Sequence, residues 1–181
     1  DKKALVSDIA GTTRTNNEGE ILWRGKNVRI IDTGGPDNSE NERFTDEIIR
    51  QSEQAVAEAD AIIFVADSRI GILPQERALI KKIREQMTAR KIPIILVANK
   101  CDKPKADADI HSNDWLSLGL GEPMPVSAAN GRGVGDMLDS VYTAVSKKSN
   151  RPKIALKDGA KEPVRVSLVG KPNVGKSSLF N

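Results

Sequence analysis

The chain has 181 residues, 38% of them hydrophobic, and its 28 Lys and Arg residues against 25 Asp and Glu give a formal net charge of +3. This length suits one α/β domain with an appended segment, and it is too short for two full domains of that kind. No apolar run approaches the roughly 20 residues that a membrane-spanning helix needs, so we expect no contact with a membrane.

Charge and cysteine content add two expectations. Residues 147–181 hold nine Lys and Arg against two Asp and Glu, or +7, which leaves 19 against 23, or −4, for residues 1–146. The basic end could face phosphate or RNA, but a solvated linker is the simpler interpretation. The single cysteine, Cys101, favours a reducing, cytoplasmic setting. The chain starts without Met and stops at Asn181 inside an expected helix, so we expect both ends to be cut.

Short β-branched runs alternate with segments of helical period from residue 20 onward, which predicts an α/β fold with a mostly parallel sheet. The expected strands are residues 27–31, 61–66, 92–98, 123–126 and 164–169. The expected helices are residues 41–58, 75–90 and 134–146.

The first segment with possible chemistry is Gly11-Thr12-Thr13-Arg14, which precedes the first strand pair. A mobile loop at this place could bring a threonine hydroxyl onto Mg²⁺ when a γ-phosphate is bound. Thr13 is favoured over Thr12 as this metal-binding and catalytic residue. A loop with no ligand role stays an open alternative.

Asp32-Thr33-Gly34-Gly35 closes the first expected strand and fits the pattern D-x-x-G. A carboxylate at the end of a strand can hold Mg²⁺ through water, and a glycine N–H can meet the γ-phosphate. Asp32 and Gly35 are the candidates for these two roles. The motif is weak by itself, because Asp and Gly commonly end strands.

Asn99-Lys100-Cys101-Asp102 follows the strand at 92–98 and fits N-K-x-D, a pattern suited to reading guanine. The Asp102 carboxylate can accept from the ring N–H and from the exocyclic amino group, a donor pair that adenine lacks. Such a buried pairing can reject the wrong base by roughly 10⁴. Asn99 would join neighbouring loops, and Lys100 would lay its stem over the base. An ordinary Asn-rich and Asp-rich surface turn is the alternative.

Ser127-Ala128-Ala129 follows the strand at 123–126, where a loop can brace the base and give a backbone N–H to its oxygen. This segment is uninformative when taken alone. His111 and Trp115 are interpreted as structural, with His111 exposed and Trp115 partly packed.

The strand at 164–169 ends in a glycine turn that fits G-x-x-x-x-G-K-[ST] and opens a helix. In this motif backbone N–H groups surround the β-phosphate, Lys176 reaches the β and γ oxygens, and Ser177 offers a hydroxyl to Mg²⁺. The candidate nucleotide-binding residues of this turn are Gly170, Asn173, Val174, Gly175, Lys176, Ser177 and Ser178.

Taken jointly, the five motifs predict a P-loop NTPase three-layer sandwich that binds GTP or GDP with Mg²⁺ and hydrolyses GTP. Pro36 occupies the position after the D-x-x-G glycine, where some GTPases carry a water-orienting Gln, so we expect slow turnover. Arg14 and the loop at 36–43 could assist hydrolysis in its place. A binding module without turnover and an ATPase that shares the P-loop are the alternatives.

Residues 118–128 and 169–181 resemble the Der, or EngA, family of translation-factor-class GTPases, which assemble ribosomes and carry two tandem G domains. Residues 6–14 are also similar to the tRNA-modifying MnmE GTPases. The resemblance implies a role in ribosome biogenesis and binding of the full-length protein to the large ribosomal subunit or its rRNA.

The order of the motifs is permuted, because the P-loop comes last in this chain. We expect residues 1–146 to form a GTPase domain without its own first strand and P-loop, and residues 147–161 to form a linker. Residues 162–181 would open a second G domain in a piece of a tandem protein, the favoured interpretation, or complete the same domain after circular permutation. Without a central strand, backbone N–H and C=O groups of the two neighbouring strands would lack hydrogen-bond partners. The strand at 164–169 is therefore predicted to insert between those at 28–32 and 61–66.

Overall fold

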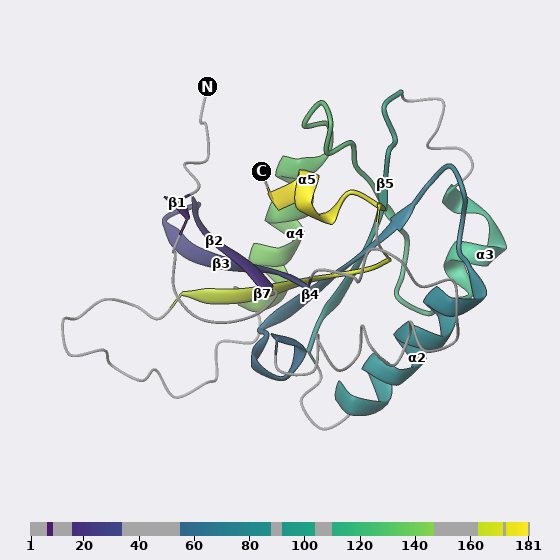
Figure 1. Ribbon diagram of the computed structural model, residues 1–181, viewed down its shortest axis with the longest axis horizontal. Coiled ribbons are helices and arrows are strands. Elements are labelled where there is room, and N and C mark those ends of the chain that lie inside the picture. Colours follow the sequence, from purple (N-terminus) through teal and green to yellow (C-terminus); the bar gives the residue numbers. More distant parts are fainter. Residues whose placement is uncertain are drawn as a thin grey trace.

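The molecule is a three-layer α/β structure with a central sheet between two layers of helices (Figure 1). Helices α2 (Pro74–Met87) and α3 (Asn113–Leu116) pack on one face of the sheet, and α4 (Val134–Ser146) and α5 (Lys176–Phe180) pack on the other. This computed structural model describes residues 7–8, 16–33, 55–87, 92–103, 110–146, 163–171 and 173–180. The predicted fold class is confirmed.

The described residues form one seven-stranded sheet in the order β1-β2-β3-β7-β4-β5-β6. β1 and β2 pair antiparallel at one edge, and the strands from β3 to β6 are parallel to one another. The strand bounds are β1 Ser7–Asp8, β2 Asn16–Trp23, β3 Lys26–Thr33, β4 Ala61–Asp67, β5 Ile94–Asn99, β6 Met124–Pro125 and β7 Val164–Val169.

β7 lies between β3 and β4, where the sequence predicted it, although about 100 residues separate it from β4 along the chain. Ser167 stands at the centre of this arrangement, opposite Ile31 of β3 and Ile62 of β4. Its buried hydroxyl donates to the Ala55 carbonyl at 2.8 Å. The predicted insertion is confirmed, and it gives the ladder groups of β3 and β4 their partners.

The central strands are apolar on both sides because both faces of the sheet are covered. In β4, Ile62 and Phe64 belong to the core under α2, whereas Ile63 and Val65 belong to the core under α4. All four side chains have no exposed surface. This double burial explains why the strand appears as an unbroken apolar run in the sequence.

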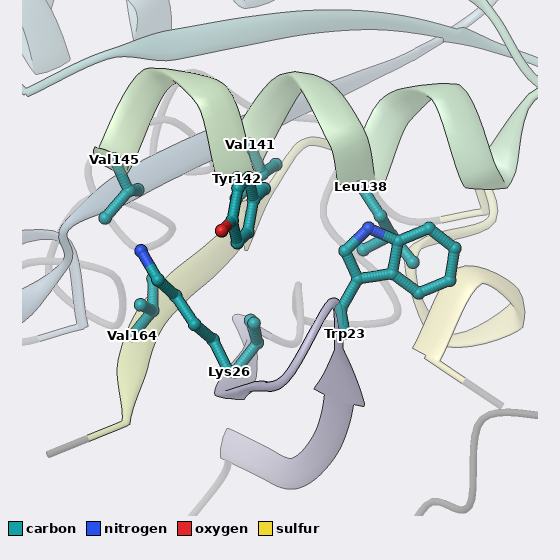
Figure 2. Close-up of a pocket in the computed structure, with 8 residues that line it drawn as sticks. Trp23, Lys26, Leu138, Val141, Tyr142, Val145 and Val164 are labelled. Carbon is teal, nitrogen blue, oxygen red and sulfur yellow. The ribbon is translucent and has the colours of Figure 1, made fainter. Parts of the chain in front are cut away.

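The β2–β3 hairpin is held against α4 by its tip (Figure 2). Its two-residue turn has positive φ at Arg24 (47°) and Gly25 (75°), the combination that suits a tight hairpin. The Trp23 indole Nε1 donates to Asp139 Oδ1 at 2.8 Å, and Arg24 forms an ion pair with the same carboxylate. The Lys26 ammonium lies 4.6 Å from the ring centroid of Tyr142. Figure 2 shows Trp23, Lys26 and Tyr142 among the side chains that line a small pocket between the hairpin and α4.

Several sequence expectations need correction or fall outside the described residues. Trp115 is buried, with 2% of its surface exposed, rather than partly packed, whereas His111 is exposed as expected. Of the helix expected at 41–58, the structure describes only residues 55–58, which are helical. The linker at 147–161 lies outside the described residues. Within the described ranges, no helix combines the length and apolar character that crossing a membrane requires.

Candidate nucleotide-binding site

Four of the five predicted motifs gather where the parallel strands of the sheet end, because each stands at or directly after the carboxyl end of its strand. Asp32 lies in β3, the turn at 170–176 follows β7, Asn99 ends β5, and Ser127 follows β6. Carboxyl ends of adjacent parallel strands are the usual place for ligands in open α/β sheets. The insertion of β7 therefore brings the late glycine turn beside the earlier loops.

Two glycines of this turn are required by close contacts. A Cβ at Gly170 would lie 2.2 Å from the Val65 carbonyl oxygen, and one at Gly175 would lie 2.2 Å from the Asn99 side-chain nitrogen. Gly175 also has φ 97°, and Asn173 has φ 61°. The side chain of Val174 points into the core, with 5% of its surface exposed. The turn is thus packed closely against β4 at Gly170 and against Asn99 at Gly175.

Lys176 is buried at the start of α5, with 5% of its surface exposed. Its ammonium donates to the carbonyls of Gly170 at 2.9 Å and Lys171 at 2.8 Å. Burial lowers the pKa of Lys176, and the nearby Asp32 carboxylate opposes this shift. A desolvated cation surrounded by carbonyl oxygens is suited to an anionic ligand, which would compensate its charge.

Asp32 of β3 contacts Ser177 at the start of α5. The Ser177 hydroxyl donates to Asp32 Oδ2 at 2.7 Å, and Asp32 is only 1% exposed. The other carboxylate oxygen, Oδ1, is buried and receives no hydrogen bond from any residue that the structure describes. Buried carboxylate oxygens without a hydrogen bond are uncommon, and a bound cation or water would satisfy this one.

The donor set fits a small, hard cation. Mg²⁺ prefers oxygen ligands, keeps several waters and uses one or two protein groups together with phosphates. Asp32 and Ser177 supply such oxygens, and the residues that the structure describes contain no cluster of three or more His, Cys, Asp or Glu side chains for a closed metal cage. The site could therefore hold Mg²⁺ together with a nucleotide.

Asn99 connects the loops of the site, as the sequence suggested. Its side-chain nitrogen donates to the Val174 carbonyl at 2.7 Å, and its side-chain oxygen accepts from the Ala128 backbone N–H at 2.9 Å. Asn99 is 2% exposed, so both bonds are shielded from water. One side chain thus links the glycine turn, the loop after β5 and the loop after β6.

Asp102 has partners on both carboxylate oxygens. The Ser127 hydroxyl donates to Oδ1 at 2.7 Å, and the guanidinium of Arg69 pairs with Oδ2. The Ser127 hydrogen bond and then the Arg69 guanidinium hold the pKa of Asp102 below its usual value. The carboxylate is therefore ionised at neutral pH.

Lys100 adopts φ 69° and pairs through its ammonium with Asp67 Oδ2 at 2.6 Å. Sequence reasoning missed Asp67, the last residue of β4, and Arg69, which lies in the loop after β4. The signal was available, because Asp67 ends a buried parallel strand. It shares with Asp32 only a carboxylate at a strand end, because Ile70 stands where the pattern D-x-x-G has its glycine.

The remaining predicted residues take no part in the described contacts of the site. Ser178 and Ala129 are exposed. Thr13 and Gly35 lie outside the described residues, as do Arg14, Pro36 and the loop at 36–43.

The fold and the glycine turn after β7 define the class as a P-loop nucleotide-binding protein. In agreement, residues 1–100 match the family model described as "50S ribosome-binding GTPase". The chain belongs to this GTPase family.

Curated relatives match across nearly the whole chain, and three examples carry the name GTPase Der. The protein of Streptomyces coelicolor is 41% identical over 180 residues, covering 99% of this chain and 37% of the relative. That of Listeria innocua is 39% identical over 181 residues, covering 100% and 38%. That of Amoebophilus asiaticus is 36% identical over 185 residues, covering 100% and 39%. The resemblance to the Der family is confirmed, and the chain spans less than two fifths of the length of these relatives.

Proposed function

We propose that this chain binds GTP and GDP together with Mg²⁺ and hydrolyses GTP slowly. The observation that carries the proposal is the hydrogen bond from Asn99 to the Val174 carbonyl, at 2.7 Å. It joins the loop expected to read guanine to the turn expected to hold phosphates. A nucleotide could then contact both in one pocket.

Each residue has a physical role in this proposal. Lys176 and the N–H groups of its turn neutralise charge on the β and γ oxygens while water attacks the γ-phosphorus and GDP leaves. Ser177, Asp32 and Thr13 would hold Mg²⁺, which when bound adds further positive charge beside the phosphates. Gly35 would meet the γ-phosphate. Pro36 offers no side-chain group to orient the attacking water, which is the basis for slow turnover.

The base would be held by the loops at the other end of the pocket. Asp102 accepts the two donors of guanine, and the stem of Lys100 covers the ring. The loop of Ser127, Ala128 and Ala129 would give a backbone N–H to the guanine oxygen. This set favours guanine over adenine.

The proposed domain organisation follows from the strand order. Residues 1–146 would supply the switch and base-reading loops, residues 162–181 would supply the central strand and phosphate loop, and residues 147–161 would link them. β7 forms five residue pairs with β3 and four with β4, which supports one composite site.

In the full-length protein we propose a role in assembly of the large ribosomal subunit, with the ribosome or its rRNA as the partner and the cytoplasm as the location. The support is the description of the matching family and the name of the relatives.

Titration of a fluorescent GDP analogue into the chain, with Mg²⁺ or with EDTA, tests the proposal. Unlabelled GDP should displace the analogue, ADP should not, and Lys176→Ala should abolish binding. Displacement by ADP as effective as that by GDP would favour an ATP-binding protein.

Phosphate release in a single turnover then separates a GTPase from a binding module. Slow release with GTP, absent in Lys176→Ala, supports hydrolysis. Tight GTP binding without release over several hours would leave the nucleotide-binding role and remove the enzymatic one.

A further inference from the structure

The contacts around Asp102 suggest a role for a residue outside the recognised motifs. Arg69 follows β4 and pairs through its guanidinium with Asp102 Oδ2, while the Ser127 hydroxyl donates to Oδ1 at 2.7 Å. Each oxygen of the carboxylate thus has one protein donor. The two donors come from different loops, so they hold the carboxylate from two sides.

A carboxylate offers about four acceptor directions, two on each oxygen. Arg69 and Ser127 occupy one on each, which leaves one on each oxygen. Guanine presents two donors side by side, the ring N–H and the amino group. The remaining capacity of Asp102 therefore matches the number and arrangement of donors on the base.

We propose that Arg69 is a positioning residue for guanine specificity, which fixes the Asp102 carboxylate so that both oxygens face the base at once. This inference rests on the proposed function and adds a determinant from the loop after β4. Arg69 itself need not touch the nucleotide.

The backbone of Arg69 is anchored for this task. Its N–H donates to Asp67 Oδ1 at 2.9 Å, and Asp67 Oδ2 pairs with the Lys100 ammonium at 2.6 Å. The neighbouring Ser68 N–H donates to the Asn99 carbonyl at 2.9 Å. The Asp67–Lys100 and Ser68–Asn99 contacts, together with the Arg69–Asp102 ion pair, connect the end of β4 and the loop after it to the base-reading loop at three points. The backbone of Arg69 is therefore held in place.

The charge of the carboxylate supports the same role. Arg69 contributes to the lowered pKa of Asp102, after Ser127, and Lys100 adds a smaller effect. The side chains of Arg69 and Asp102 are 63% and 37% exposed, so the ion pair should add little to fold stability. A substitution at Arg69 should consequently change recognition and leave the fold intact.

The test compares GDP with inosine diphosphate, which keeps the ring N–H and lacks the amino group. A carboxylate that turns freely can still accept one hydrogen bond, but it meets two donors less often. Arg69→Ala should therefore weaken GDP by about 3- to 10-fold and inosine diphosphate by less than about twofold. Arg69→Lys, which keeps the charge, should recover part of the preference. Affinities come from competition against the fluorescent GDP analogue.

Arg77→Ala is a matched control, because Arg77 pairs with Asp114 at 2.9 Å and also donates to the Ser117 hydroxyl, away from the proposed pocket. It should leave the GDP to inosine diphosphate ratio unchanged. Thermal melting of both variants measures any effect on the fold.

The possible results are distinct. An unchanged ratio in Arg69→Ala, or tighter GDP binding, overturns the role of Arg69 while GDP binding by the native chain upholds the proposed function. Absence of GDP binding by the native chain overturns both.

Discussion

Each end of the proposed pocket contains a serine that donates a hydrogen bond to an aspartate, but the two pairs differ in burial. At the phosphate end, Ser177 donates to Asp32 at 2.7 Å, and at the base end, Ser127 donates to Asp102 at 2.7 Å. Asp32 is 1% exposed, whereas the side chain of Asp102 is 37% exposed. Equal hydrogen bonds therefore differ in how far water can replace them.

The difference separates binding energy from selectivity. At the phosphate end a buried ammonium, Lys176, and a buried oxygen of Asp32 both lack a full set of compensating charges among the described residues. A bound phosphate would compensate the ammonium and Mg²⁺ the carboxylate oxygen, so this end should dominate affinity. At the base end Asp102 is already paired and solvated, so it should mainly decide which base is accepted.

The largest effect is expected for Lys176→Met, which keeps the bulk and removes the charge. Nucleotide affinity should fall by at least about 100-fold, because the β and γ oxygens lose their nearest cation. Isothermal titration with GDP and Mg²⁺ measures the loss. A loss of less than about fivefold would show that the phosphate end does not dominate affinity.

The same variant should not be less stable without nucleotide. Because burial lowers the pKa of Lys176, the unfolded chain binds this proton more tightly than the folded one. The native stability of the wild type therefore rises with pH toward the ordinary lysine value of 10.5. Lys176→Met lacks this dependence, so its melting temperature at pH 7 should equal or exceed that of the wild type, and the advantage should narrow as pH rises.

The next effect, at the base end, is a change of specificity. Asp102→Asn replaces one acceptor by a donor, which opposes the guanine amino group and suits the carbonyl that xanthine carries there. GDP should weaken by at least about 100-fold, and xanthosine diphosphate should bind more tightly than to the wild type. Competition against the fluorescent analogue gives both values. Asp114→Asn, an exposed Asp outside the pocket, is the control, and an equal loss for both nucleotides would argue against base reading.

The link between the two ends can be broken at Gly175. In Gly175→Ala the new Cβ would lie 2.2 Å from the Asn99 side-chain nitrogen, at φ 97°. Crowding and backbone strain should cost about 2–5 kcal/mol of stability. GDP affinity should fall by about tenfold, because Asn99 no longer joins the two loops.

Gly121→Ala separates strain from crowding, since Gly121 has φ 87° and nothing within 4 Å of its added Cβ. It should cost only the backbone strain. Urea denaturation of both variants without nucleotide gives the comparison, and equal costs would show that the contact with Asn99 is unimportant.

Much of this arrangement was predictable from sequence, for identifiable reasons. The central strands are buried on both faces and form continuous apolar runs, and the motifs stand directly after them. The place of β7 followed from the gap that β3 and β4 would otherwise leave. Strand β2 was missed, because its residues 16–20 are Asn, Asn, Glu, Gly and Glu, and its pairing with β3 defines it rather than any apolar pattern.

The partners of the motifs were harder to predict than the motifs themselves. Arg69 lies 33 positions before Asp102, and no local period relates them. Their contact depends on the register of β4 against β5, in which Asp67 stands opposite Asn99. A carboxylate at the end of β4 marks Asp67 as a candidate, but no pattern in a single sequence shows that Arg69 pairs with Asp102.

The smallest expected effect compares the two serines directly, in the absence of nucleotide. Ser177→Ala removes the hydrogen bond to Asp32, which is buried and shielded from water, so stability should fall by about 1–3 kcal/mol. Ser127→Ala leaves Asp102 paired with Arg69 and open to water, so its loss should be smaller. Ser177 is itself exposed and Ser127 fully buried, hence packing alone would give the opposite order. Urea denaturation midpoints of the two variants decide between burial of the carboxylate and burial of the serine as the controlling factor.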